Sequence, residues 1–158
     1  EVFDRLEIEG LGMNTVSLVE EAIALKQEAE KNRTPYIETW AVFDRDDFPL
    51  ENFKKALNLA EKNGVRCAYS IESFELWYLL HFGYCDAKLS RKEYCEKLTT
   101  HLRTYYKKND PDIYRKLHGR MKTAIKNATT LYDRQSTKKL TDQNPITLVF
   151  QLVQRLEE

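Results

Sequence analysis

Three carboxylates stand within four positions at Asp44-Arg45-Asp46-Asp47, directly after an apolar run. In extended backbone, side chains two residues apart leave on the same side, so Asp44 and Asp46 could share one hard cation such as Mg²⁺ or Mn²⁺. Asp47 is a further candidate metal ligand, and Arg45 is a candidate contact to a nucleic-acid phosphate. The simpler alternative is that Asp46 or Asp47 only caps a helix that begins near Pro49.

Two glutamates, Glu72 and Glu75, follow the next expected strand. Parallel strands lie about 4.8 Å apart and end at the same edge of the sheet, where open α/β folds bind their ligands. Glu75 is therefore a candidate catalytic residue beside Asp44 and Asp46, and an additional metal ligand. Alternatively, a glutamate in a first helical turn only complements the helix dipole.

Basic residues gather after residue 102, where Arg103, Lys107 and Lys108 are interleaved with Tyr105 and Tyr106. Helical spacing would place several of them on one face, as phosphate contacts beside rings that can stack on bases. We take Arg103, Lys107 and Lys108 as candidate nucleic-acid contacts. The alternative is an ordinary solvated helix surface with the tyrosines in the core.

Other catalytic patterns are missing from the sequence. His81 has no second His or Cys at ligand spacing, which is more typical of a hydrogen-bonded packing residue than of a metal ligand. The three cysteines show no CxxC spacing, which indicates reduced thiols and a cytoplasmic location. Neither a GxSxG elbow nor a GxGxxG or GxxxxGK[ST] loop occurs, so serine hydrolases and standard nucleotide-binding loops are disfavoured.

The elements that would position these residues alternate between strand and helix. Strands are expected over 2–8, 36–43 and 65–71, with helices over 16–29 and 50–63 between them, which predicts an α/β fold with a mainly parallel sheet flanked by helices. The second half is expected to be helical, over 74–82, 90–106, 110–128 and 144–156. The chain is therefore expected to be one domain, with an α/β core over 1–82 and a helical part over 83–158.

Composition limits the partners. The 158 residues carry 25 Lys plus Arg and 25 Asp plus Glu, so any attraction to nucleic acid must come from local patches. No apolar run approaches the roughly 20 residues that cross a bilayer, and the first residues lack a signal-peptide pattern. A membrane partner is not expected, and an oligomer remains open.

Two blocks resemble the RloB family in their order and spacing: WAVFDRDD at 40–47 and FELWYLLHF at 74–82. Weaker matches at 12–15 and 144–147 extend the likeness over nearly the whole chain. RloB proteins are linked to restriction and abortive-infection loci of bacteria and archaea. The resemblance implies cytoplasmic antiviral defence, with a partner protein of the same system as one possible interaction.

The resemblance also implies a Toprim-like Rossmannoid fold and a magnesium-dependent nuclease that cleaves DNA or RNA. Asp44 and Asp46 match the DxD of the Toprim module. The glutamate of that module belongs to an EGEKTE-like block that is absent here, so the chain is expected to lack an amino-terminal strand and the catalytic Glu. A non-catalytic sensor or interaction module of a defence system is the alternative.

Overall fold

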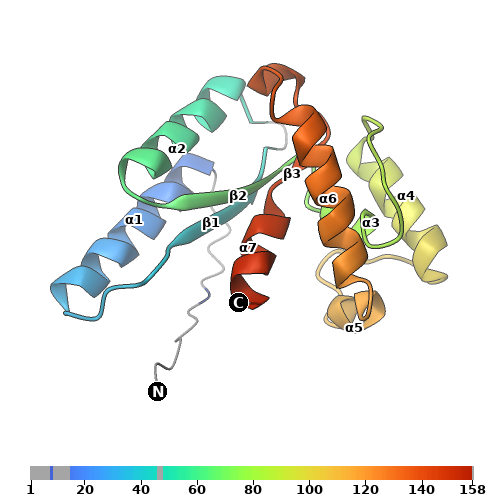
Figure 1. The fold of residues 1–158 in the computed structure, drawn as a ribbon, viewed down its shortest axis with the longest axis horizontal. Helices are drawn as coiled ribbons and strands as arrows, with labels where there is room; N and C mark the ends of the chain where they lie inside the picture. Colours follow the sequence, from blue (N-terminus) through green and yellow to red (C-terminus); the bar gives the residue numbers. More distant parts are fainter. Residues whose placement is uncertain (1–7, 9–14, 46–47, 158) are drawn as a thin grey trace.

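The computed structural model describes residues 8, 15–45 and 48–157, and these form an α/β fold (Figure 1). In chain order the elements are α1 (Thr15–Lys31), β1 (Trp40–Asp44), α2 (Leu50–Lys62), β2 (Arg66–Ile71), α3 (Glu75–Leu79), α4 (Arg91–Leu102), α5 (Ile113–Leu117), α6 (Met121–Gln135), a 3₁₀ turn (Leu140–Asp142), β3 (Ile146–Thr147) and α7 (Val149–Glu157). Among these described helices, none combines the length and apolar character needed to span a membrane.

The described strands form one sheet in the order β1-β2-β3. β1 runs parallel to β2, with Asp44 opposite Ser70, whereas β3 runs antiparallel to β2, with Ile146 opposite Ile71. The sheet in the described part of the chain is thus mixed, where the sequence predicts a mainly parallel one. The difference comes from β3, a two-residue strand inside the segment 144–156 that was predicted to be helical.

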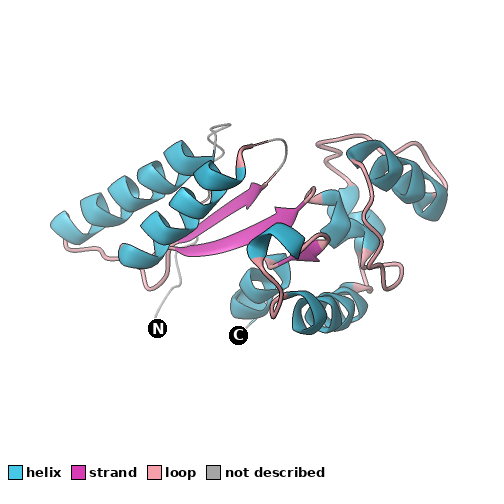
Figure 2. Ribbon diagram, turned by 90° about the horizontal axis from the view of Figure 1, so that it is seen from above, coloured by secondary structure: helices cyan, strands magenta, loops and turns pink. Residues whose placement is uncertain are grey.

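The sheet carries a helical layer on one side, formed by α1 and α2 (Figure 2). Side chains alternate along each strand, so Ala41 of β1 packs with Val19 of α1, and Tyr69 of β2 packs with Phe53 of α2. By the same alternation Asp44 leaves β1 on the opposite side from Ala41 and Phe43. The acidic end of β1 is thereby directed away from the α1–α2 layer.

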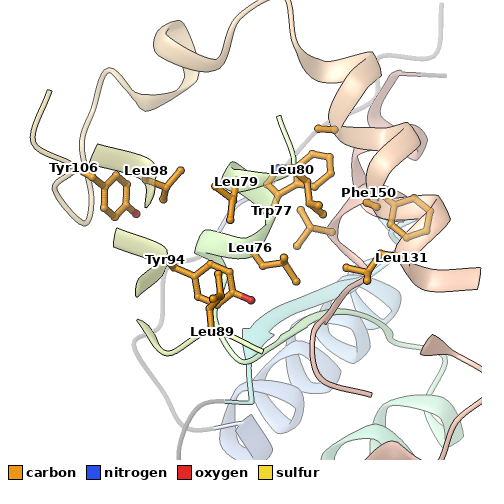
Figure 3. Close-up of a cluster of buried hydrophobic side chains, with 13 residues drawn as sticks. Leu76, Trp77, Leu79, Leu80, Leu89, Tyr94, Leu98, Tyr106, Leu131 and Phe150 are labelled. Atoms are coloured by element: carbon orange, nitrogen blue, oxygen red, sulfur yellow. The ribbon is translucent and has the colours of Figure 1, made fainter. Parts of the chain in front are cut away.

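The helices of the second half surround a separate apolar cluster (Figure 3). Leu76 of α3 and Leu80, which directly follows α3, lie between side chains of α4, such as Leu98, and side chains of α6 and α7, such as Leu131 and Phe150. All five are at most 5% exposed. Residues from α3, next to β2, are therefore held by helices that lie much later in the chain.

Several predicted boundaries are corrected. The helix expected over 90–106 ends at Leu102, because Arg103 adopts a left-handed conformation with φ of 55°. The helix expected over 110–128 is two helices, α5 and α6, interrupted around Gly119, whose φ is +79°. The helix expected over 144–156 begins only at Val149. The predicted strand over 2–8 lies outside the described residues except for Ile8, which belongs to no helix or strand.

Candidate functional site

The candidate site lies where β1 and β2 end side by side. Pairing continues one residue past β1, because the backbone N–H of Arg45 donates to the carbonyl of Ser70 at 2.9 Å. Three residues separate the end of β2 from Glu75, the first residue of α3. The strand ends thus bring Asp44 and Glu75 close enough for the charge of Glu75 to raise the pKa of Asp44.

Asp44 is a desolvated carboxylate. Its side chain is 21% exposed, and burial raises its pKa from 3.8 to about 6, against the lowering effects of the nearby Phe74 backbone N–H and of Arg91 and Lys108. Oδ2 lies 3.7 Å from Nη2 of Arg91. Oδ1 is buried and accepts no hydrogen bond from the described residues. An orphaned carboxylate oxygen of this kind suits a hard cation such as Mg²⁺.

Glu75 is held by hydrogen bonds on both carboxylate oxygens. The hydroxyl of Tyr106 donates to Oε1 at 3.0 Å, and the hydroxyl of Ser73 donates to Oε2. Tyr106 is itself fixed, because its backbone N–H donates to Thr99 Oγ1 at 3.1 Å. Burial and the charge of Glu75 raise the pKa of Tyr106, so the phenol stays protonated as a donor. Glu75 therefore has a defined orientation at 9% exposure.

Two cations border these carboxylates. Arg91 is the first residue of α4, whose start is fixed by a capping box in which Ser90 and Glu93 exchange hydrogen bonds. Lys108 is exposed and lies close enough to Asp44 to lower its pKa. The site thus combines negative groups that could hold a metal with positive groups that could meet a phosphate.

The structure brings together only some of the predicted site residues. Asp46 and Asp47 lie outside the described residues, and among the residues that are described no three His, Cys, Asp or Glu side chains form a metal-binding group. Arg45 is half-buried, and Arg103 and Lys107 are exposed.

Sequence reasoning missed three residues of the site: Ser73, Arg91 and Tyr106. Ser73 lies two residues before Glu75 in the chain, whereas Arg91 and Tyr106 reach the acidic corner formed by Asp44 and Glu75 through tertiary packing. No motif in the sequence marks Arg91 or Tyr106 for this role. Glu72, the other glutamate that follows β2, acts on Tyr94, whose pKa is raised mainly by burial.

Two cavities lie away from this corner, and neither is lined by Asp44 or Glu75. One of about 420 Å³ is formed largely by residues of α2 and β2, and one of about 170 Å³ by residues of α3, α5 and the start of α6.

Comparisons with known proteins support the family suggested by the motifs. No curated protein and no solved structure matches the chain. A family model described as "RloB-like protein" matches residues 4–156, which include both motif blocks, the acidic corner and every described helix except the last residue of α7. The chain therefore belongs to the RloB-like protein family.

Proposed function

We propose that this chain is a metal-dependent nuclease of a prokaryotic antiviral defence system, which hydrolyses phosphodiester bonds in DNA or RNA. One observation carries the proposal: Asp44 ends β1 with a buried, unpartnered carboxylate oxygen beside Glu75. A carboxylate that is costly to ionise on its own is stabilised by a bound cation. We further propose a Toprim-like Rossmannoid core, which the helix–strand–helix–strand order with acid at the strand end supports.

In the proposed site, Asp44 would hold Mg²⁺ or Mn²⁺ together with Asp46 and Asp47. The bound metal would supply a nucleophilic water and neutralise charge on the scissile phosphate. Glu75, oriented by hydrogen bonds from Ser73 and Tyr106, would accept the proton that the attacking water loses.

The nucleic acid would approach from the side of the cations. The charges of Arg91 and Lys108 act on Asp44, and Arg45 follows Asp44 directly in the chain. Arg103 and Lys107 are exposed and extend the positive surface, so they would contact neighbouring phosphates. Replacing Lys108 or Arg103 by Ala would weaken binding evenly across sequences and flatten its dependence on salt.

The second candidate is a non-catalytic sensor or interaction module, whose helical half would dock a partner protein of the same defence system or another copy of the chain. The observation that favours it is that the carboxylates of Asp44 and Glu75 already interact with other side chains of the protein. Arg91 pairs with Asp44, and both oxygens of Glu75 are occupied by donors from the protein. A site filled in this way can serve structure instead of catalysis.

A cleavage screen separates the two candidates. The natural full-length protein is incubated with pools of labelled DNA and RNA in Mg²⁺, in Mn²⁺ and in a chelator. We expect cleavage only with metal. The cleavage rate should fall at least about a hundredfold for Asp44→Ala and for Asp46→Ala, because removing one member of a cooperating catalytic set can remove most of the rate. Asp133→Ala, an exposed carboxylate of α6, serves as the matched control and should cleave normally.

Metal binding is measured separately by calorimetry and thermal unfolding. At a hundred times the dissociation constant, Mg²⁺ should stabilise the wild-type fold by about 2.7 kcal/mol and leave Asp44→Ala unchanged. Metal binding without cleavage on any substrate would support the non-catalytic module. Cleavage by Asp44→Ala at the parent rate would rule out the site.

A further inference from the structure

A small cavity with aromatic walls lies in the helical half, between α3, α5 and the start of α6. Its volume is about 170 Å³, below the roughly 300–1,000 Å³ of pockets for drug-sized ligands. Trp77 and Tyr78 of α3 line one side, and Tyr114 of α5 and His118 line the other. Trp77 is 4% exposed and Tyr114 is 70% exposed, so the cavity runs from the core to solvent. A single flat ring system suits this space.

His81 gives the cavity a hydrogen-bond acceptor. Its Nδ1 lies 2.9 Å from the carbonyl oxygen of Trp77, and because a carbonyl can only accept, Nδ1 must carry the hydrogen. Burial lowers the pKa of His81, so the ring is neutral and Nε2 keeps a lone pair. No described residue donates a hydrogen bond to Nε2 of His81, which lines the cavity. A ligand with a ring N–H or an amino group would satisfy it.

Arg120 places a positive charge beside the cavity. Its guanidinium lies 5.0 Å above the ring of Phe82, and its charge contributes to lowering the pKa of His81, which shows that the two groups are near each other. The neighbouring cations of α5 are already paired, Arg115 with Asp112 and Lys116 with Asp110. Arg120 has no such carboxylate partner among the described side chains, and it is exposed.

From this arrangement we infer that the cavity binds a single nucleobase, with Arg120 on the phosphate of the same nucleotide. Trp77, Tyr78 and Tyr114 would pack against the flat base, and Nε2 of His81 would accept from its polar edge. An apolar side chain of a protein partner fits less well, because it would leave both Nε2 and Arg120 without a partner. The occupant is either a free nucleotide or one base of a single strand.

Contacts between aromatic side chains connect the cavity to the acidic corner. The rings of Tyr78 and Tyr106 are 6.3 Å apart and meet edge to face, and Tyr106 donates to Glu75. A base held here would therefore contact the same helix, α3, that positions Glu75. Binding at this cavity needs no metal, so its test is independent of cleavage at Asp44.

The test is a titration of the full-length protein in a chelator with AMP, GMP, CMP and UMP, and with a short single-stranded oligonucleotide. Trp77 lines the cavity, so quenching of tryptophan fluorescence reports occupancy, and a Trp40→Phe background assigns the signal to Trp77. Saturable quenching by a mononucleotide identifies a free nucleotide as ligand. Saturable quenching by the oligonucleotide alone identifies a base within a strand.

Substitutions of two exposed residues test whether the ligand binds in this cavity. Tyr114→Ala and Arg120→Ala should each weaken binding about tenfold, the lower part of the range for loss of a stacked base or a phosphate contact. The matched controls are Tyr84→Ala and Arg134→Ala. Both residues are exposed, and the guanidinium carbon of Arg134 lies 5.3 Å from the ring centre of Tyr84. Absence of saturable binding by every ligand would overturn the inference, as would equal losses in the control pair.

Discussion

The hydroxyl of Tyr106 donates a hydrogen bond of 3.0 Å to Oε1 of Glu75, and both side chains are at least nine-tenths buried. This bond joins the segment after α4, which carries Lys107 and Lys108, to the first residue of α3. The carboxylate of the candidate site and a basic segment beside it are thereby held by one contact.

Tyr106→Phe removes this hydrogen bond and keeps the ring. Because hydrogen bonds to charged groups are worth about 1.5–3 kcal/mol, we expect the free energy of unfolding to fall by roughly that amount. Urea denaturation measures the change. Tyr105→Phe is the matched control, since the neighbouring tyrosine is 73% exposed and its hydroxyl should contribute little. Equal stability of the two variants would show that the bond to Glu75 is not formed in solution.

The same variant probes the proposed nuclease activity. Loss of Tyr106 removes one of the two donors that orient Glu75, so cleavage by Tyr106→Phe should drop about tenfold while binding of nucleic acid is retained. A filter-binding assay and a cleavage assay on the same preparation separate these effects. A parallel loss of both would point to general unfolding, which the denaturation curve detects.

Asp44 makes stability depend on pH. Its pKa in the folded chain is about 6 and its ordinary value is 3.8, so the folded state binds the proton more tightly. The stability contributed by the protonated carboxyl is complete below about pH 4 and is lost as the pH rises through 6. We therefore expect that, in a chelator, the free energy of unfolding of Asp44→Asn rises by about 2 to 3 kcal/mol relative to the parent as the pH increases from about 4 through 6. The size follows because one pKa unit is worth about 1.4 kcal/mol.

The measurement is the difference in unfolding free energy between parent and Asp44→Asn at pH 4, 5, 6 and 7. Asp133→Asn, which changes an exposed carboxylate in the same way, is the control variant. A constant difference for Asp44→Asn across this range would mean that the carboxyl ionises as it does in water.

The start of α4 fixes Arg91 beside Asp44. Ser90 Oγ accepts from the N–H of Glu93 at 3.3 Å, and Glu93 Oε2 accepts from the N–H of Ser90 at 2.8 Å. Ser90→Ala should cost about 1 kcal/mol, as is usual for loss of an N-cap. Lys97→Ala, exposed in the same helix, is the control and should stay within about 0.5 kcal/mol. Thermal unfolding distinguishes the two.

Much of the first half was predictable from the sequence because its periodicities are strong. The apolar spacing in α1 and α2 and the apolar run of β1 gave their type and order correctly. β3 was missed because two residues show no period. The break at Gly119 was missed because the apolar stripe of α5 and α6 continues across it, while the backbone leaves the helical conformation there.

The candidate site was predictable only where strand ends determine position. Asp44 and Glu75 follow parallel neighbouring strands, so local pattern and fold rules place them together. Arg91 and Tyr106 come from distant helices and loops, and their approach depends on the packing of α3 against α4 around Leu76 and Leu98. Side chains that reach a site through tertiary packing leave no spacing signature in a single sequence.

The attachment of β3 provides a last test of how the sheet is completed. The hydroxyls of Ser70 and Thr147 lie 2.8 Å apart, and neither residue is exposed. Thr147→Val leaves the hydroxyl of Ser70 buried without this partner and removes the acceptor 3.3 Å from the N–H of Val149, so it should cost about 1–3 kcal/mol. Ser70→Ala alone should cost less, because Thr147 keeps Val149 as a partner.

The double variant, Ser70→Ala with Thr147→Val, removes both hydroxyls and leaves no orphan between them. Its loss of stability should be smaller than the sum of the two single losses by about 1 kcal/mol, measured as a double-mutant cycle in urea. Strict additivity would mean that the two hydroxyls do not interact, and that β3 is held to β2 by its backbone and by apolar contacts such as that between Ile71 and Ile146 alone.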